Sequence, residues 1–194
     1  MGLDMYLERC KKVVFPYVNK DIEELKESED ENDKILLEFL KPYIRKRGKY
    51  IQWDSLGEEV AYWRKANQIH KWFVENVQGG EDDCRHYAVH KEQLEDLLDI
   101  CKQIEEKAVM QKGKVVNGQT VKDGEWVNIY EDGYNIINPE ICEELLPTQS
   151  GFFFGSTAYD QYYMDDIRST IEQLEEVIAE TDWETETVYY RASW

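Results

Sequence analysis

The chain has 194 residues, enough to bury a hydrophobic core without disulfides or a structural metal. Aromatic residues make up 13% of it, which argues against disorder because aromatic side chains provide the burial that offsets the entropy of ordering. The net charge of -18 repels nucleic-acid phosphates and anionic membrane surfaces, so we expect no direct nucleic-acid partner and no membrane partner.

The cysteines and the opening residues indicate a cellular compartment. Met1–Asp4 lacks the charged and then apolar pattern of a signal segment, and no apolar run approaches the roughly 20 residues of a membrane span. None of the cysteines forms a CxxC pair; they are Cys10, Cys84, Cys101 and Cys142. The sequence therefore predicts free thiols and a cytoplasmic protein.

Both ends of the chain alternate between apolar and polar residues. In 1–14, Leu3, Met5 and Leu7 alternate with polar neighbours, and 186–194 has a similar pattern. A period of two is typical of a strand with one buried face. We therefore expect one sheet that includes both termini.

Residues 19–34 are rich in acids and precede a predicted helix that ends at Pro42. Its apolar residues at helical spacing are Ile35, Leu36, Phe39 and Leu40. The acidic stretch is interpreted as a solvated surface, with phosphate mimicry as the alternative. The basic residues that follow either balance these acids or contact phosphate; they are Lys41, Arg45, Lys46, Arg47 and Lys49.

A long helix is predicted over 55–78, ended by Gly79-Gly80. On it Trp63, Asn67 and His70 share one face. One interpretation is a core tryptophan with hydrogen-bonded Asn and His. The other is a ligand site, in which Trp63 stacks on a ring while Arg64, Asn67 and His70 meet an anion.

The remaining elements are predicted in chain order. A short strand covers 86–89, and a helix over 91–110 buries Leu94, Leu97, Leu98, Cys101 and Ile104. Asn117-Gly118, Asp123-Gly124 and Asp132-Gly133 are hairpin signals, so 111–138 is predicted as a β-hairpin insertion. The last helix spans 159–180; its buried stripe is Tyr163, Ile167, Ile171, Leu174 and Ile178.

The segment 146–157, which precedes the last helix, is a second candidate for ligand binding. Gly151 and Gly155 bracket three phenylalanines, and Ser156 or Thr157 is predicted to cap the helix. A Gly-Ser-Thr turn at a helix N-terminus offers backbone N–H groups to phosphate, and Gln149 adds polarity upstream. The structural alternative is a buried Phe strand followed by a capped helix.

A metal site is considered at residues 82–90. Cys84, His86 and His90 lie near two aspartates, but their spacing fits no zinc pattern. No spacing brings a cysteine and a histidine within hydrogen-bond reach for nucleophilic catalysis. We expect no metal and no cofactor.

Three of these segments resemble a family of uncharacterised phage and prophage proteins. The resemblance rests on the Met-Gly-Leu-Asp-Met-Tyr start at 1–6, Trp-Arg-Lys-Ala-Asn-Gln-Ile-His at 63–70 and Gly-Phe-Phe-Phe-Gly-Ser-Thr at 151–157. It does not cover 23–49 or the hairpins, and it transfers no activity to any residue. It implies a phage gene, and small accessory phage proteins often counter host defence.

Together these patterns predict a single α+β domain over 1–194, with a small, mainly antiparallel sheet packed by three or four helices. The leading functional hypothesis is a binding protein for a small anionic, nucleotide-like ligand. Its predicted site is Trp63, Arg64, Asn67, His70, Gln149, Ser156 and Thr157. The alternatives are an acidic inhibitor of a basic host protein, which mimics nucleic acid, and a hydrolase that acts on nucleotides. A homodimer is also considered, because aromatic residues often line interfaces.

Overall fold

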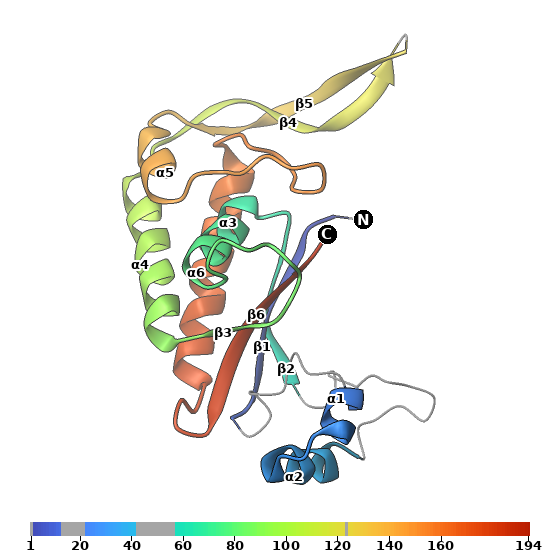
Figure 1. The fold of residues 1–194 in the computed structure, drawn as a ribbon. Helices are drawn as coiled ribbons and strands as arrows, with labels where there is room; N and C mark the ends of the chain where they lie inside the picture. Colours follow the sequence, from blue (N-terminus) through green and yellow to red (C-terminus); the bar gives the residue numbers. More distant parts are fainter. Residues whose placement is uncertain (1, 13–21, 42–56, 123) are drawn as a thin grey trace.

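A computed structural model describes residues 2–12, 22–41, 57–122 and 124–194 (Figure 1). Its larger sheet has the strand order β2-β1-β6-β3, and all of its pairings are antiparallel. The strands are β1 (Asp4–Lys11), β2 (Gly57–Arg64), β3 (Tyr87–Val89) and β6 (Glu186–Ser193). The two terminal strands pair with each other from Asp4 opposite Ser193 to Lys11 opposite Glu186. The prediction of an α+β fold whose sheet includes both termini is confirmed.

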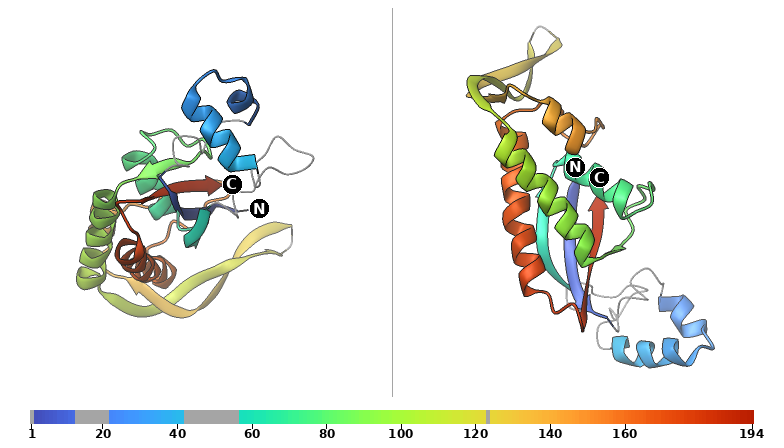
Figure 2. Two further views of the ribbon diagram at one scale, coloured as in Figure 1. Left: turned by 90° about the horizontal axis from the view of Figure 1, so that it is seen from below. Right: turned by 90° about the vertical axis from the view of Figure 1, so that its left-hand side faces the viewer.

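The alternation of β1 decides which face of this sheet is covered. Leu3, Met5 and Leu7 are fully buried, whereas Asp4 and Tyr6 between them are partly exposed. Helices α4 (Lys91–Lys107) and α6 (Gln161–Glu180) pack side by side over one face of the sheet (Figure 2). They bury the leucines and isoleucines predicted for them, apart from Ile178, which is only partly buried.

The predicted hairpin insertion is also confirmed. It consists of β4 (Met110–Lys122) and β5 (Glu125–Ile136), which project from one end of the molecule (Figure 1). Gly124 has a φ of 85° beside the turn, whereas Gly118, at 97°, lies in a bulge where the register shifts. Gly133 lies within β5, where an added Cβ would come within 2.7 Å of Val115. Only Asp123-Gly124 therefore lies at the hairpin turn. Asn117-Gly118 forms a bulge, and Asp132-Gly133 allows close packing within the ribbon.

Helices α1 (Ile22–Glu27) and α2 (Glu31–Leu40) lie at the opposite end of the molecule (Figure 1). Asp30 caps α2 by accepting a hydrogen bond from Asn32 N, and Leu36 and Leu40 are buried as predicted. Pro42 and most of the predicted basic cluster, from residue 45 onward, lie outside the described residues.

The predicted helix over 55–78 is wrong in its first half. Residues 57–64 form β2, in which Ala61 and Trp63 point inward while Tyr62 and Arg64 point outward. Lys65 follows with a φ of 63°, which neither a helix nor a strand accommodates. Helix α3 (Asn67–Asn76) starts only after this break. Trp63 and Asn67 therefore belong to two elements and share no helix face.

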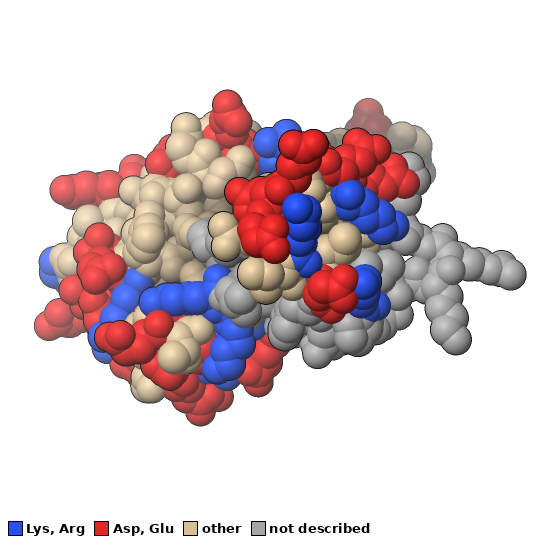
Figure 3. All heavy atoms as spheres, turned by 60° about the horizontal axis from the view of Figure 1, so that its bottom comes forward, with Lys and Arg blue, Asp and Glu red and all other residues tan. Residues whose placement is uncertain are grey.

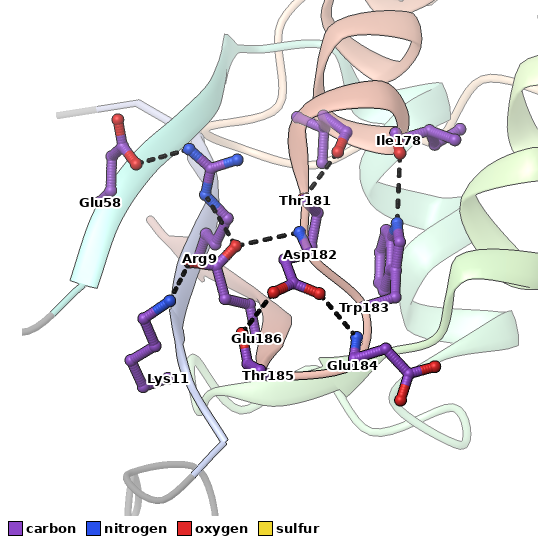
Figure 4. Close-up of polar contacts among 11 residues, drawn as sticks. Arg9, Lys11, Glu58, Ile178, Thr181, Asp182, Trp183, Glu184, Thr185 and Glu186 are labelled. Atoms are coloured by element: carbon purple, nitrogen blue, oxygen red, sulfur yellow. Dashed lines mark hydrogen bonds and ion pairs between the residues drawn. The ribbon is translucent and has the colours of Figure 1, made fainter.

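A polar network joins the turn between α6 and β6 to the sheet (Figure 4). Asp182 accepts hydrogen bonds from Thr185 Oγ1 at 2.7 Å and from Glu184 N at 3.1 Å. Glu186, at the start of β6, binds Lys11 of β1 at 2.7 Å. The last helix is thereby fixed against the end of the central strand pair.

Candidate functional site

A cleft of about 750 Å³ lies between the hairpin and the body of the protein. Its volume is within the range of small-molecule sites. Three segments distant in sequence form it: the β2–α3 junction, the loop before α6 with the first turns of α6, and the bulged part of the hairpin. The side chains used below are Arg64, Lys65, Gln68, Asn117, Gln119, Ser156, Tyr162, Asp165 and Asp166.

The β2–α3 junction supplies the cations of the cleft. Arg64 is the last residue of β2, and its side chain is 61% exposed, with Asp4 at 3.9 Å. Lys65 has a left-handed backbone, which costs a non-glycine residue on the order of 1 kcal/mol. Lys65 N donates to Leu3 O at 2.8 Å, and Lys65 O accepts from Asn67 N at 2.8 Å, so this conformation is held on both sides.

Asn67 holds the loop before α6 against this junction. Its Nδ2 donates to the carbonyls of Phe154 at 3.0 Å and Ser156 at 2.7 Å, and its Oδ1 accepts from Gln149 N at 2.8 Å. Gly155 lies between these carbonyls with a φ of 88°, and an added Cβ would meet the Cβ of Lys65 at 3.0 Å. One buried amide thus brings Ser156 to the same cleft as Lys65.

The start of α6 supplies the carboxylates of the cleft. Asp165 is exposed, whereas Asp166 is half-buried and accepts a hydrogen bond from Gln68 Nε2 at 3.0 Å. Burial raises the pKa of Asp166 to about 6, with Gln68 opposing the shift. The cleft therefore carries two cations and three carboxyl groups: the exposed Asp165, the half-buried Asp166 with its pKa of about 6, and the buried Asp160 at the N-terminus of α6.

The first turn of α6 is already occupied by Asp160. Its Oδ1 accepts hydrogen bonds from Tyr162 N at 2.9 Å and from Tyr163 N at 3.5 Å. The predicted cap at Ser156 or Thr157 is therefore wrong. These N–H groups are also not free to bind a phosphate, and a second anion there would meet the Asp160 carboxylate.

The hairpin forms the opposite wall of the cleft. Tyr162 OH donates to Glu131 Oε1 at 2.5 Å, and Asn117 Nδ2 donates to Glu131 Oε2 at 2.6 Å. These bonds join the bulge at Asn117 to α6. Gln119 Nε2 donates to Asn128 Oδ1 at 2.9 Å, which leaves further amide groups for a ligand.

Trp63 and His70 lie in the interior, so their predicted contact with a ligand is corrected. Trp63 is 3% exposed, and its Nε1 donates to Thr170 Oγ1 at 2.9 Å. His70 is fully buried, with Tyr190 OH 2.8 Å from Nδ1 and Asp82 Oδ2 2.9 Å from Nε2. The side-chain amide of the buried Asn67 likewise forms its hydrogen bonds within the protein rather than with a ligand.

The structure brings together only two of the seven predicted site residues on the surface of the cleft. Arg64 and Ser156 line it. Gln149 is half-buried, and its backbone bonds Asn67. Thr157 is exposed outside the lining, and its carbonyl accepts from Thr148 Oγ1 at 3.2 Å. These two residues shape the loop and do not face the cleft.

In the segment considered for a metal site, residues 82–90, the side chains point to different partners. His86 lies 3.4 Å from Glu8, and His90 caps α4. In the described part of the chain, no group of three His, Cys, Asp or Glu side chains is placed to hold a metal ion. Burial raises the pKa of Cys10 to about 11 and that of Cys101 to about 12, so neither thiol ionises readily.

Compared with family models, curated proteins and solved structures, this chain matches none of them. The resemblance to phage proteins therefore stays a prediction. Its three segments nevertheless meet at one place in the fold: Leu3 N donates to Phe153 O at 3.1 Å, and Asn67 bonds the loop that follows.

Sequence reasoning missed most of the lining of the cleft. Asp165 and Asp166 are two of 41 acidic residues, and nothing in the sequence singles them out. Asn117 was assigned to a turn, although it faces the cleft from a bulge. Lys65 was missed as well, because no local sequence pattern marks the break between β2 and α3 at which it lies.

Proposed function

We propose that this protein is a binding protein that captures a small anionic, nucleotide-like ligand in the cleft beneath the hairpin. The observation that carries the proposal is the convergence of Arg64, Lys65 and Ser156 on one wall of a ligand-sized cleft. Arginine and lysine are the side chains that bind phosphate most strongly, and a serine hydroxyl adds a neutral donor.

The carboxyl groups that α6 contributes to the cleft narrow the class of ligand. Asp165 and Asp166 repel a purely anionic molecule, but carboxylates accept hydrogen bonds from sugar hydroxyls, as in dinucleotide-binding sites. A nucleoside phosphate has both kinds of group: its phosphate suits Arg64 and Lys65, and its hydroxyls suit the acids. The amides of the hairpin are suited to the edge of a base.

The strain at Lys65 supports a binding role for this wall. A left-handed lysine persists only where its surroundings hold it, and such residues concentrate at functional sites. A glycine would relieve the strain at this position but would lose the cation.

The charge pattern favours this proposal over nucleic-acid mimicry. A mimic of nucleic acid presents a continuous anionic surface. Figure 3 shows that, on the face seen there, Lys and Arg side chains lie among the acids. The exposed pairs Lys11–Glu186 and Arg9–Glu58 neutralise part of that end of the molecule.

Binding can be tested by thermal shift with nucleoside mono-, di- and triphosphates and with cyclic nucleotides. A ligand at 100 times its Kd should add about 2.7 kcal/mol to the free energy of unfolding. Arg64→Gln and Lys65→Asn should abolish the shift, because asparagine tolerates the left-handed backbone but has no charge. Lys102→Gln is the matched control, because Lys102 of α4 pairs with Glu175 of α6 and does not line the cleft. Stabilisation that survives both cleft substitutions, or no stabilisation by any nucleotide, would refute the proposal.

The resemblance to phage proteins extends the proposal to counter-defence, in which the protein sequesters a nucleotide signal of the host. Sequestration and hydrolysis differ in what is recovered. A sequestering protein releases its nucleotide chemically intact after heat denaturation, whereas a hydrolase releases products.

A further inference from the structure

The hairpin carries a row of exposed aromatic side chains that the cleft does not use. Trp126 is 71% exposed, Tyr130 59% and Tyr134 43%. They are four residues apart on β5, so they lie on one face of the ribbon, here called the aromatic face, with Asn128 and Asp132 between them. Val121, which pairs with Trp126 in the register, extends it on β4, whereas Val116, which pairs with Tyr130, lines the cleft.

Where the ribbon lies against α6, near Glu131 and Gly133, the aromatic face points away from the body of the protein. The intervening residues of β5 make the contacts with α6: Glu131 binds Tyr162, and Gly133 packs beside Gln161. In the described structure the ribbon has only two strands, and the outer edge of β5 is paired at its base, where Asn135 bridges to Asp160. Such a ribbon is marginal in water by itself, and exposed apolar patches of this kind mark interaction surfaces.

The charge of the ribbon selects its partner. Strand β4 carries Lys112, Lys114 and Lys122 and no acid, whereas β5 carries Glu125, Glu131 and Asp132 and no base. These charges cancel, in a chain whose net charge is -18. A basic protein would be attracted to the acidic body rather than to this neutral ribbon, whereas a second copy can meet the first copy here without opposing its charge.

We propose that two copies of this chain dimerise by stacking their aromatic faces. A two-fold axis parallel to the strands exchanges the two edges, so β4 of one copy lies over β5 of the other. Asp132 forms an ion pair with Lys114 of its own copy at 2.7 Å, and Lys112 and Lys114 of the other copy then lie over the strand that carries this pair. Since α6 contacts the reverse side of the ribbon, the two bodies stay on the outer sides of the stack.

The experiment is sedimentation velocity of the full chain over a range of concentrations. The wild-type protein should show a monomer–dimer equilibrium. Trp126→Ser and Tyr130→Ser should each weaken dimerisation by about ten-fold or more, because buried aromatic side chains dominate interface energies. Ile35→Ser is the matched control, since Ile35 is 61% exposed on α2, and α2 lies at the opposite end of the molecule from the hairpin (Figure 1). It should leave the equilibrium unchanged.

The strand arrangement is tested by reversing charges. Lys112→Glu and Asp132→Lys should each weaken the homodimer, and an equimolar mixture of the two variants should recover association as a heterodimer. Circular dichroism establishes that each variant is folded. A wild-type protein that is monomeric at every concentration would overturn the proposal and leave a different protein as the occupant of the aromatic face. Variants that dimerise like the wild type would also overturn it.

Discussion

His70 shows how a predicted ligand residue becomes part of the core. Burial raises the pKa of Tyr190 well above its ordinary value, so its hydroxyl stays protonated and donates to His70 Nδ1. His70 Nε2–H then donates to Asp82 Oδ2, which also accepts from Trp194 Nε1 at 3.0 Å. This chain of hydrogen bonds joins α3 to the end of β6. Sequence patterns cannot separate a buried, bonded histidine from a ligand-binding one, because both need polar partners.

We expect His70→Phe to lower the free energy of unfolding by about 2–4 kcal/mol, because it leaves Tyr190 OH buried without a partner. The double variant with Tyr190→Phe should regain part of this loss, since both polar partners are then removed. Urea denaturation of the two single variants and the double variant measures the coupling. Additive losses would contradict the hydrogen-bond account.

Asp166 gives stability a predictable pH dependence. Its pKa rises from 3.8 unfolded to about 6 folded through burial, so the folded state prefers the protonated carboxyl group. Its contribution is fully present below pH 3.8 and is lost as the pH rises through 6. Asp166→Asn should therefore match the wild type at low pH and exceed its stability at pH 8, by on the order of 1–3 kcal/mol. Melting temperatures across this range measure the difference; parallel curves would contradict the assignment.

Among the elements, those with strong periodicity were predicted correctly. The 3.6-residue stripe of apolar residues predicted helix α4, and the alternation of apolar and polar residues predicted both terminal strands. Each of these elements has one buried face, which produces the pattern. Strand β2 was missed because apolar residues at 60, 63, 74 and 77 also fit a helix, and only the left-handed Lys65 separates the strand from α3. No local pattern announces a left-handed lysine.

The loop before α6 depends on Asn67 for its position. Asn67→Ala removes three hydrogen bonds and leaves the carbonyls of Phe154 and Ser156 without this donor. We expect a loss of about 2–4 kcal/mol in the free energy of unfolding, together with weaker nucleotide binding. Gln173→Ala is a control at a different element, since its Oε1 accepts from Tyr62 N at the edge of the sheet. It should destabilise the protein and leave binding unchanged; equal losses of binding in both variants would show that the loop has no special role.

For the whole molecule, Glu8 is a link between three segments of the sheet region. It lies on β1 and contacts Arg191 of β6 at 3.0 Å and His86, just before β3, at 3.4 Å. Burial alone would raise the pKa of Glu8. The hydrogen bonds and charges of His86 and Arg191 outweigh this effect and lower the pKa from 4.5 to about 2. The resulting stability is present above pH 4.5 and is lost as the pH falls through 2.

Glu8→Gln should therefore be less stable than the wild type at pH 7, and the difference should vanish toward pH 2. Denaturant titrations at several pH values measure it. A difference that persists at the acid end would show that packing of the side chain, rather than its charge, stabilises the sheet.

At the same scale, the described residues include no helix both long and apolar enough to cross a membrane. The arrangement of the ends of the molecule could not be predicted, because the hairpin and the α1–α2 pair lie far apart through packing that no local sequence pattern encodes. The cleft is a product of this arrangement. It exists because side chains from three distant segments, among them Lys65, Asn117 and Asp166, line one space.

The central claim is that the cleft beneath the hairpin binds an anionic, nucleotide-like ligand. The most direct measurement is a titration of the isotope-labelled protein with the nucleotide that shifts its melting temperature most, followed by the amide resonances in NMR spectra. The account predicts saturable shifts at Lys65, Ser156 and Gln119, with the amides of Trp126 and Ile35 unchanged. Shifts confined to other surfaces, or none at saturating nucleotide, would contradict it.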